Sequence, residues 1–299
     1  MQSVRRKEIE LMAIEKTYKM SDQKVPPSNW EDYKRITLNE WKQLLNGIDK
    51  KEKDFQMFLE LNPSLIPGAH SLALTSGHMP IYASCFSQPV LPGIKCKIPD
   101  FMWLSTCSDE LNPILIEIED PKKKWFNRNG QPTAKFTQAH NQINEWRVWF
   151  SKPNNVNLFI ETYKIDTSRA EGRRIVPHYV LIYGRREDVL EKSSERSAYK
   201  KPDETIMTYD RLQPSYEQSK YLCIKIKNNG FHVITFPSTG KIGPNIIEEW
   251  INLKGLDEAI KKSSEIAENR KRFLLQRLPY WIEWAKDSNA GIIDGGDWE

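Results

Sequence analysis

The chain has 299 residues, of which 39% are apolar, and it carries a formal net charge of +4. This length fits one large domain or two smaller ones, and the apolar content is sufficient for a hydrophobic core. The sequence has neither a run of about 18 apolar residues nor a charged-then-apolar leader, so we expect a cytoplasmic globular protein with no membrane partner.

The cysteines and the basic residues narrow the possible chemistry. The four cysteines lie far apart and form no CxxC pair, so the sequence favours reduced structural thiols over a zinc cluster or a disulfide framework. Basic residues gather in three short segments, at positions 122–124, 169–174 and 185–186. Such clusters permit a polyanionic partner, although a solvated surface explains any single cluster equally well.

Apolar residues at helical spacing predict three helices near the N-terminus, over residues 4–20, 30–47 and 50–62. We expect Thr37 to cap the second helix and Gly47 to end it. The third helix ends at Asn62, because the residue before a proline avoids the helical region. Glu52 lies in the first turn of this third helix.

The segment over residues 64–91 is irregular, with one strand predicted over residues 81–86. It contains His70 and His78, which are eight residues apart in a loop with glycine and proline. Loop hydrogen bonding explains these two histidines better than a metal site does.

The central part of the chain alternates strands and helices. Two strands joined by a polar turn are predicted within residues 97–121, and a helix over residues 133–150 has Thr133 as its N-cap. Gln138 and Gln142 lie at the margin of the apolar face of this helix, where they can reach the end of the preceding strand. Further along, strands are predicted over residues 157–163 and 178–183, a helical segment from residue 187 and a short strand over residues 208–212. This series predicts an α/β fold with a central sheet.

The C-terminal part has a different composition. Strands over residues 221–227 and 231–236 flank Asn228-Asn229-Gly230, which predicts a β-hairpin because Asn-Gly supplies positive backbone angles. A helical tail over residues 256–287 is predicted to be interrupted at Pro279. We divide the chain into a helical N-terminal extension (1–47), a central domain (48–213) and an α+β C-terminal extension (214–299). Whether the last part is a second domain or extends the first sheet stays open.

An unusual number of acids surrounds the two strands within residues 97–121. Asp100 leads into the first strand, and Glu117, Glu119 and Asp120 end the second, whose apolar run is long enough to be buried. Buried charges need a partner, and paired strands bring their acids to one point, where oxygen ligands can hold a hard divalent ion. Glu117 and Glu119 point to the same side because side chains alternate along a strand. Asp120 is expected to point the other way.

These acids belong to an ordered set of motifs. The set comprises Glu52-x-x-Phe55-Gln56-x-Phe58-Leu59-Glu60-x-Asn62-Pro63, Pro99-Asp100-Phe101, Glu117-Ile118-Glu119-Asp120-Pro121, Ala139-x-x-Gln142-x-x-x-Trp146, Ile182-Tyr183-Gly184-Arg185-Arg186 and Thr208-Tyr209-Asp210-Arg211-Leu212. In order and spacing it resembles the nuclease domain of the Shedu anti-phage defence proteins, within the PD-(D/E)XK phosphodiesterase superfamily. The resemblance covers residues 50–212, a little over half of the chain.

The resemblance implies a restriction-endonuclease-like core, a mixed sheet flanked by helices, that hydrolyses phage or foreign DNA with Mg²⁺ or Mn²⁺. It implies that Asp100 and Glu117 bind the metal, that Glu52 on the first helix of this core completes the site, and that Gln142 packs behind it. It also implies a homo-oligomer. Glu119 occupies the position at which the superfamily usually has a lysine, so it is a candidate site residue of a different kind.

The glutamate at position 119 reverses the sign of the charge that a lysine would provide. Glu119 then becomes an additional metal ligand, or Lys122, Lys123 or Lys124 takes over the role of the lysine, or activity is lost. We favour the first possibility, because Glu52, Asp100, Glu117 and Glu119 together could hold one or two ions.

Three functional hypotheses follow. The leading one is a metal-dependent DNA endonuclease in phage defence. The alternative is a catalytically impaired module that keeps the fold and binds nucleic acid through its basic loops. In a third, purely structural interpretation, Glu117 and Glu119 pair with Arg185 or Arg186. Tyr209 and Asp210 are assigned to a turn and are left out of the site.

Overall fold

The computed structural model describes residues 25–68, 70, 72, 79–93, 96–107, 109–166, 172–199, 201–286 and 299. The helix predicted over residues 4–20 and the residue His78 lie outside these ranges. In the part of the chain that is described, no helix is both long enough and apolar enough to cross a membrane.

A mixed nine-stranded sheet forms the centre of the fold and confirms the predicted α/β class. Its strand order is β6-β5-β3-β2-β1-β7-β8-β9, and β4 pairs with β3 beside this path. The strands are β1 (Ser84–Ser87), β2 (Phe101–Thr106), β3 (Glu110–Ile118), β4 (Arg174–Ile175), β5 (His178–Ile182), β6 (Glu204–Met207), β7 (Leu222–Lys227), β8 (Gly230–Thr235) and β9 (Leu253–Lys254).

The strand pair expected within residues 97–121 is β2 and β3, which run antiparallel. Phe101 lies opposite Ile116 in this register, so Asp100, one residue earlier, lies beside Glu117. On its other edge β3 pairs in parallel with β5. The apolar run of β3 is completely buried between these neighbours, as its composition predicts.

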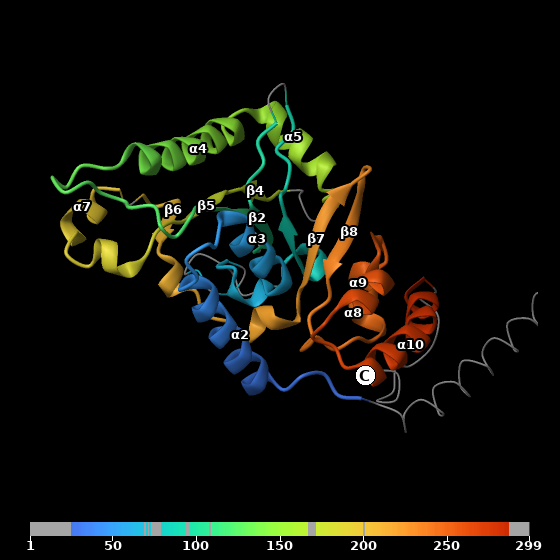
Figure 1. Ribbon diagram of the computed structural model, residues 1–299. Helices are drawn as coiled ribbons and strands as arrows, with labels where there is room; N and C mark the ends of the chain where they lie inside the picture. The colour runs from blue at the N-terminus through green and yellow to red at the C-terminus, as the bar shows by residue number, and fades with distance from the viewer. Residues whose placement is uncertain are drawn as a thin grey trace, which may run out of the picture.

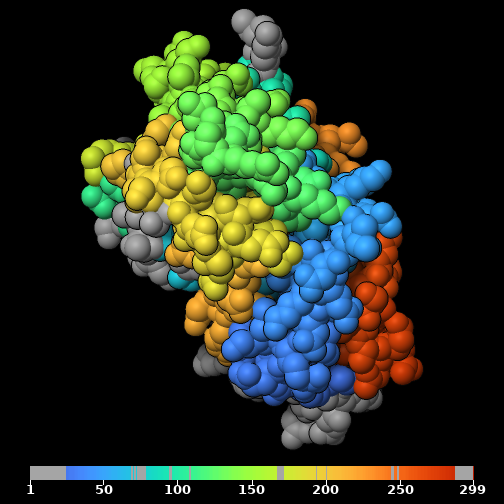
Figure 2. All heavy atoms as spheres, turned by 60° about the vertical axis from the view of Figure 1, so that its left-hand side comes forward, coloured from blue at the N-terminus to red at the C-terminus, as the bar shows by residue number. Residues whose placement is uncertain are grey.

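Helices cover both sides of the sheet. Figure 1 shows α4 and α5 on one side of the central strands and α2 and α3 on the other, while α8 to α10 accompany the hairpin β7-β8. The helices are α2 (Trp30–Leu45), α3 (Glu52–Leu61), α4 (Ala134–Phe150), α5 (Pro153–Thr162), α7 (Ser193–Ser197), α8 (Pro244–Trp250), α9 (Leu256–Lys262) and α10 (Glu268–Lys286). Figure 2 shows the blue segment around α2, the green segment around α4 and the yellow segment around α7 next to one another on one face.

Two helix caps were predicted, and one of them is correct. Thr133 caps α4, since its hydroxyl accepts a hydrogen bond from the amide of Phe136 at 3.2 Å. The prediction of Thr37 as the cap of α2 is wrong. Asn29 caps this helix, with its side chain accepting from the amide of Glu31 at 2.9 Å, and Thr37 is buried inside the helix.

The strand predicted over residues 157–163 is wrong, because this segment belongs to the helix α5 and its C-cap. Pro153 occupies the first turn, where its missing amide costs nothing. Phe159 and Tyr163, four residues apart, are both buried with ring centroids 4.7 Å apart. Rings this close fit a helix, where residues four apart are neighbours, because the same two residues of a strand would lie about 13 Å apart.

Three smaller predictions also need correction. The strand predicted over residues 81–86 is a 3₁₀ turn followed by β1, and the one over residues 208–212 is a 3₁₀ turn that follows β6. The segment from residue 187 lies mostly in a 3₁₀ turn before the short helix α7. In the C-terminal tail the break falls between α9 and α10, while Pro279 lies inside α10. Leu278 and Trp281 on either side of this proline are buried, so packing holds the helix together there.

The predicted hairpin is present as β7 and β8, and its place in the sheet answers the open question about the C-terminal part. Strand β7 pairs in parallel with β1, so the hairpin extends the same sheet as the central strands. The positive φ angles at the turn are 47° and 57° and belong to Asn228 and Asn229, whereas Gly230 already begins β8. The two asparagines therefore form the turn that the sequence suggested for Asn-Gly.

Candidate active site

Asp100 and Glu117 lie together where β3 ends. The amide of Asp100 donates to the carbonyl of Ile116 at 3.0 Å, which continues the pairing of β2 with β3 by one residue. The Asp100 carboxylate then turns across β3, where its Oδ2 accepts from the amide of Ile118 at 2.8 Å. Glu117 is the residue between these two positions, and only 8% of it is exposed. The backbone of β3 thus fixes the Asp100 carboxylate and places Glu117 beside it.

Gln142 of α4 reaches the end of β3, as its position on the helix predicted. Its side-chain amide donates to Oε1 of Glu117 at 2.6 Å. The other oxygen of Glu117, Oε2, is buried, and no donor among the described residues reaches it when both acids are ionised; when Glu117 is protonated, it hydrogen-bonds to the Asp100 carboxylate. A buried carboxylate oxygen without a donor is costly, and a cation beside it would remove the cost.

The two carboxyl groups resist ionisation. Burial raises the pKa of Asp100 to about 7, and repulsion from Glu52 and Glu119 adds to this effect, while the bond from the Ile118 amide opposes it. Burial also raises the pKa of Glu117 well above its usual range, and repulsion from Asp100, Glu119 and Glu52 acts in the same direction. Neighbouring carboxyl groups with raised pKa values are a frequent feature of catalytic and metal sites.

Glu119 and Glu52 complete the acidic cluster. Strand pairing continues past β3, since the amide of Glu119 donates to the carbonyl of Ile182 at 3.0 Å. Glu119 forms an ion pair with Lys123, and the ammonium of Lys123 also lies 3.5 Å from Oε2 of Glu52. Glu52 begins α3, so a residue 48 positions before Asp100 joins the same cluster.

Lys123 is the residue that sequence reasoning did not single out. Lys122, Lys123 and Lys124 were equivalent candidates, and only their side-chain contacts separate them. Lys122 donates to the carbonyl of Lys50 at 3.1 Å, and Lys124 lies 3.9 Å from Asp188. Because these partners come from distant parts of the chain, spacing within the sequence could not distinguish the three lysines.

The oxygen atoms of the acidic cluster are suitable ligands for a hard divalent cation, although the side chains are not arranged as a complete metal centre. Among the residues that the structure describes, no three histidine, cysteine or acidic side chains are grouped so that they could hold a metal ion. Four carboxyl groups nevertheless share one cluster, and one buried oxygen of Glu117 has no donor among the described residues when both Glu117 and Asp100 are ionised. Carboxylate oxygens are the ligands that Mg²⁺ and Mn²⁺ prefer.

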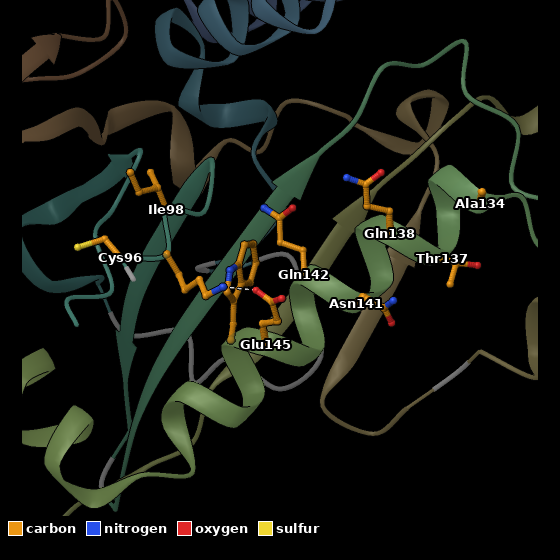
Figure 3. A pocket seen from close by; sticks show the side chains of 10 residues that line it. Cys96, Ile98, Ala134, Thr137, Gln138, Asn141, Gln142 and Glu145 are labelled. Atoms are coloured by element: carbon orange, nitrogen blue, oxygen red, sulfur yellow. Dashed lines mark hydrogen bonds and ion pairs between the residues drawn. The ribbon is translucent and has the colours of Figure 1, made fainter. Parts of the chain in front are cut away.

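An open groove of about 700 Å³ lies along α4. Figure 3 shows Gln138, Asn141 and Gln142 of α4 on one side and the segment with Cys96 and Ile98 on the other. An ion pair between Lys97 and Glu145 joins the two sides. Gln142 lines the groove and also binds Glu117, so the groove lies next to the acids.

The pairing with Arg185 that the structural interpretation expected is wrong, and Glu119 pairs with Lys123. Arg185 pairs with Asp210 instead, with Nη2 2.8 Å from Oδ1, and the amide of Arg186 donates to Oδ2 of Asp210 at 2.6 Å. Tyr209 is buried and stacks on Trp41 at 5.8 Å between ring centroids. The assignment of Tyr209 and Asp210 to a turn is therefore confirmed.

His70 and the cysteines have structural surroundings. The Nε2 atom of His70 lies 2.7 Å from the hydroxyl of Tyr221, in agreement with loop hydrogen bonding. All four cysteines are free thiols, and Cys85 and Cys223 are buried opposite each other in β1 and β7.

Comparison with known proteins identifies the family. A family model described as "Shedu protein SduA, C-terminal" matches residues 49–213, which is more than half of the chain. A search of curated proteins finds no match. The matched segment contains every residue of the acidic cluster and Gln142. The chain belongs to the Shedu SduA C-terminal family.

Proposed function

We propose that this Shedu-family protein is a metal-dependent DNA endonuclease that hydrolyses phosphodiester bonds in phage or foreign DNA. One observation carries the proposal. Asp100 and Glu117 lie side by side at the end of β3, and no donor among the described residues reaches the buried Oε2 of Glu117 when both acids are ionised. Such a pair requires a cation to become fully ionised, and a carboxylate-bound divalent cation is the usual cofactor for hydrolysis of phosphodiesters.

Asp100 and Glu117 would hold the ion, Mg²⁺ or Mn²⁺. When bound, such an ion lowers the pKa of a coordinated water and offsets the charge of the phosphate. Gln142 holds one oxygen of Glu117 and so orients the other toward Asp100. Glu119 and Glu52 lie on the Lys123 side of the cluster, and the substrate would approach from the groove along α4, which Gln142 lines.

DNA cleavage by matched variants tests the proposal. Purified wild-type protein and Glu117→Gln are incubated with supercoiled plasmid and with linear DNA in Mg²⁺, Mn²⁺ or chelator. Wild-type protein should cleave only with metal, and Glu117→Gln should lose at least about 10²-fold in rate, since the amide cannot serve as an anionic ligand.

Glu110→Gln is the control for this test. Glu110 lies on the same strand at its opposite end, where it pairs with Arg174 at 2.7 Å, so the substitution should leave cleavage unchanged. Equal cleavage by the wild-type protein and Glu117→Gln would contradict the assignment, as would cleavage that survives chelation.

One observation favours a second candidate function. Glu119 follows β3 directly, at the position where the PD-(D/E)XK nucleases usually have a lysine. Without that lysine, the protein could be a module that binds nucleic acid and does not cut it. Such a module would bind DNA without metal and would lose affinity steeply with salt. It would also cleave none of the tested substrates, so the same assay separates the two functions.

A further inference from the structure

Lys123 occupies a distinctive position among the acids. It lies in the turn after β3, where its amide donates to the carbonyl of Asp120 at 2.9 Å. Its side chain runs back to the cluster and forms ion pairs with Glu119 and Glu52. Only 24% of the Lys123 side chain and 14% of the Glu119 side chain are exposed, so the ammonium is held rather than free in solvent.

The acidic cluster needs a positive charge to receive a phosphate. Asp100, Glu117, Glu119 and Glu52 repel one another, and burial strengthens their repulsion. A phosphodiester that approaches this cluster adds a further negative charge. A bound cation would offset part of it, and a fixed ammonium at the edge of the cluster would offset more.

The contacts of Lys123 leave it able to act on a substrate. An ammonium has three N–H donors, and its ion pairs with Glu119 and Glu52 occupy two of them. The third donor is available for a water or for a phosphate oxygen. The neighbouring lysines point elsewhere, because Lys122 donates to backbone carbonyls of residues before α3 and Lys124 lies beside Asp188.

We propose that Lys123 is a catalytic residue that stabilises the phosphate during cleavage, and that Glu119 is the positioning residue that holds it. This inference rests on the proposed nuclease function. The positioning role proposed for Glu119 replaces the expectation that Glu119 is an additional metal ligand. The strand position that faces the site holds a carboxylate, and this carboxylate draws in an ammonium from four residues further along the chain.

Substitution of Lys123 separates this role from metal binding. Lys123→Ala should lower the cleavage rate by about 10²-fold, the usual cost of removing one donor to a transition-state oxyanion. Binding of Mn²⁺, measured by calorimetry, should be unchanged or tighter, because Asp100 and Glu117 remain and the competing ammonium is gone. Lys123→Arg keeps the charge and should retain part of the rate.

Two controls and one exchange sharpen the test. Lys261→Ala removes a lysine that pairs with Asp257 at the same four-residue spacing in α9, and it should leave cleavage unchanged. Lys124→Ala removes an adjacent charge and should weaken DNA binding at most. In the exchange variant, Glu119→Lys with Lys123→Ala, the ammonium comes from the strand itself, and cleavage should recover from the level of Lys123→Ala.

The possible results distinguish the role of Lys123 from the proposed nuclease function on which it depends. Wild-type protein that cleaves no DNA with either metal overturns both. Cleavage by Lys123→Ala at the wild-type rate overturns the role of Lys123 alone and indicates that the ammonium only fills the cluster before metal binds. Loss of Mn²⁺ binding together with cleavage in Lys123→Ala overturns it too, because the lysine would then only build the metal site.

Discussion

Asp100→Asn should stabilise the metal-free protein near neutral pH. The aspartate ionises near pH 4 in an unfolded chain, whereas burial and the neighbouring acids raise the pKa of Asp100 to about 7 in the folded protein. Between these values the folded state binds more protons than the unfolded state, so stability falls as pH rises. Asparagine keeps an oxygen for the amide of Ile118 and removes the titrating charge.

The size of the effect follows from the difference between the two pKa values. A difference of about three pH units corresponds to a cost on the order of 4 kcal/mol, fully present above about pH 7 and absent below about pH 4. Urea unfolding of chelator-treated protein at several pH values measures it. The variant should gain on the order of 4 kcal/mol over the wild type at about pH 8, and much less at about pH 5.

Asp210→Asn is the matched control, because its carboxylate has the opposite environment. Pairing with Arg185 and the amide of Arg186 holds the pKa of Asp210 below its usual range despite partial burial. Its ionised form stabilises the fold above the unfolded pKa, and this contribution disappears as pH falls through the folded pKa. Asp210→Asn should therefore lose stability at neutral pH. An Asp100→Asn variant that is no more stable than the wild type at about pH 8 would refute the reasoning.

Three further results are expected. Gln142→Ala removes the donor to Glu117 and should lower metal affinity or cleavage about 10- to 100-fold, as measured by calorimetry and plasmid cleavage. Mn²⁺ affinity should rise as pH increases through about 7, because the metal must displace the proton of Asp100, and calorimetry in two buffers should detect proton release. Asn229→Gly should preserve or raise the unfolding temperature, whereas Asn229→Val should lower it, since a β-branched residue tolerates the positive φ of this turn poorly.

Local rules predicted those features that depend on neighbouring residues in the chain. The strand pair around the acids, the cap at Thr133 and the hairpin at Asn228 each follow from spacing, capping or turn chemistry. The convergence of Asp100 with Glu117 is of the same kind, because a short connection fixes the register of β2 against β3.

Local rules failed where a distant contact decided the structure. Phe159 and Tyr163 are compatible with a strand in sequence, since residues four apart share one face of a strand as well as of a helix, and the packing of the two rings against each other fits only the helix. The break expected at Pro279 is absent because buried side chains on both sides hold α10. The C-terminal hairpin joins the main sheet through β1, a partner more than a hundred residues earlier in the chain.

The sequence by itself determined that a carboxylate pair lies at the end of a buried strand and that Gln142 faces it. Alternation along β3 and helical spacing along α4 are sufficient for both. The tertiary structure alone decided which cation meets these acids. Lys122, Lys123 and Lys124 are chemically alike and adjacent, and the positions of α3 and of Asp188 separate them. Only Lys123 is brought to Glu119 and Glu52, because an ion pair depends on which elements meet in space.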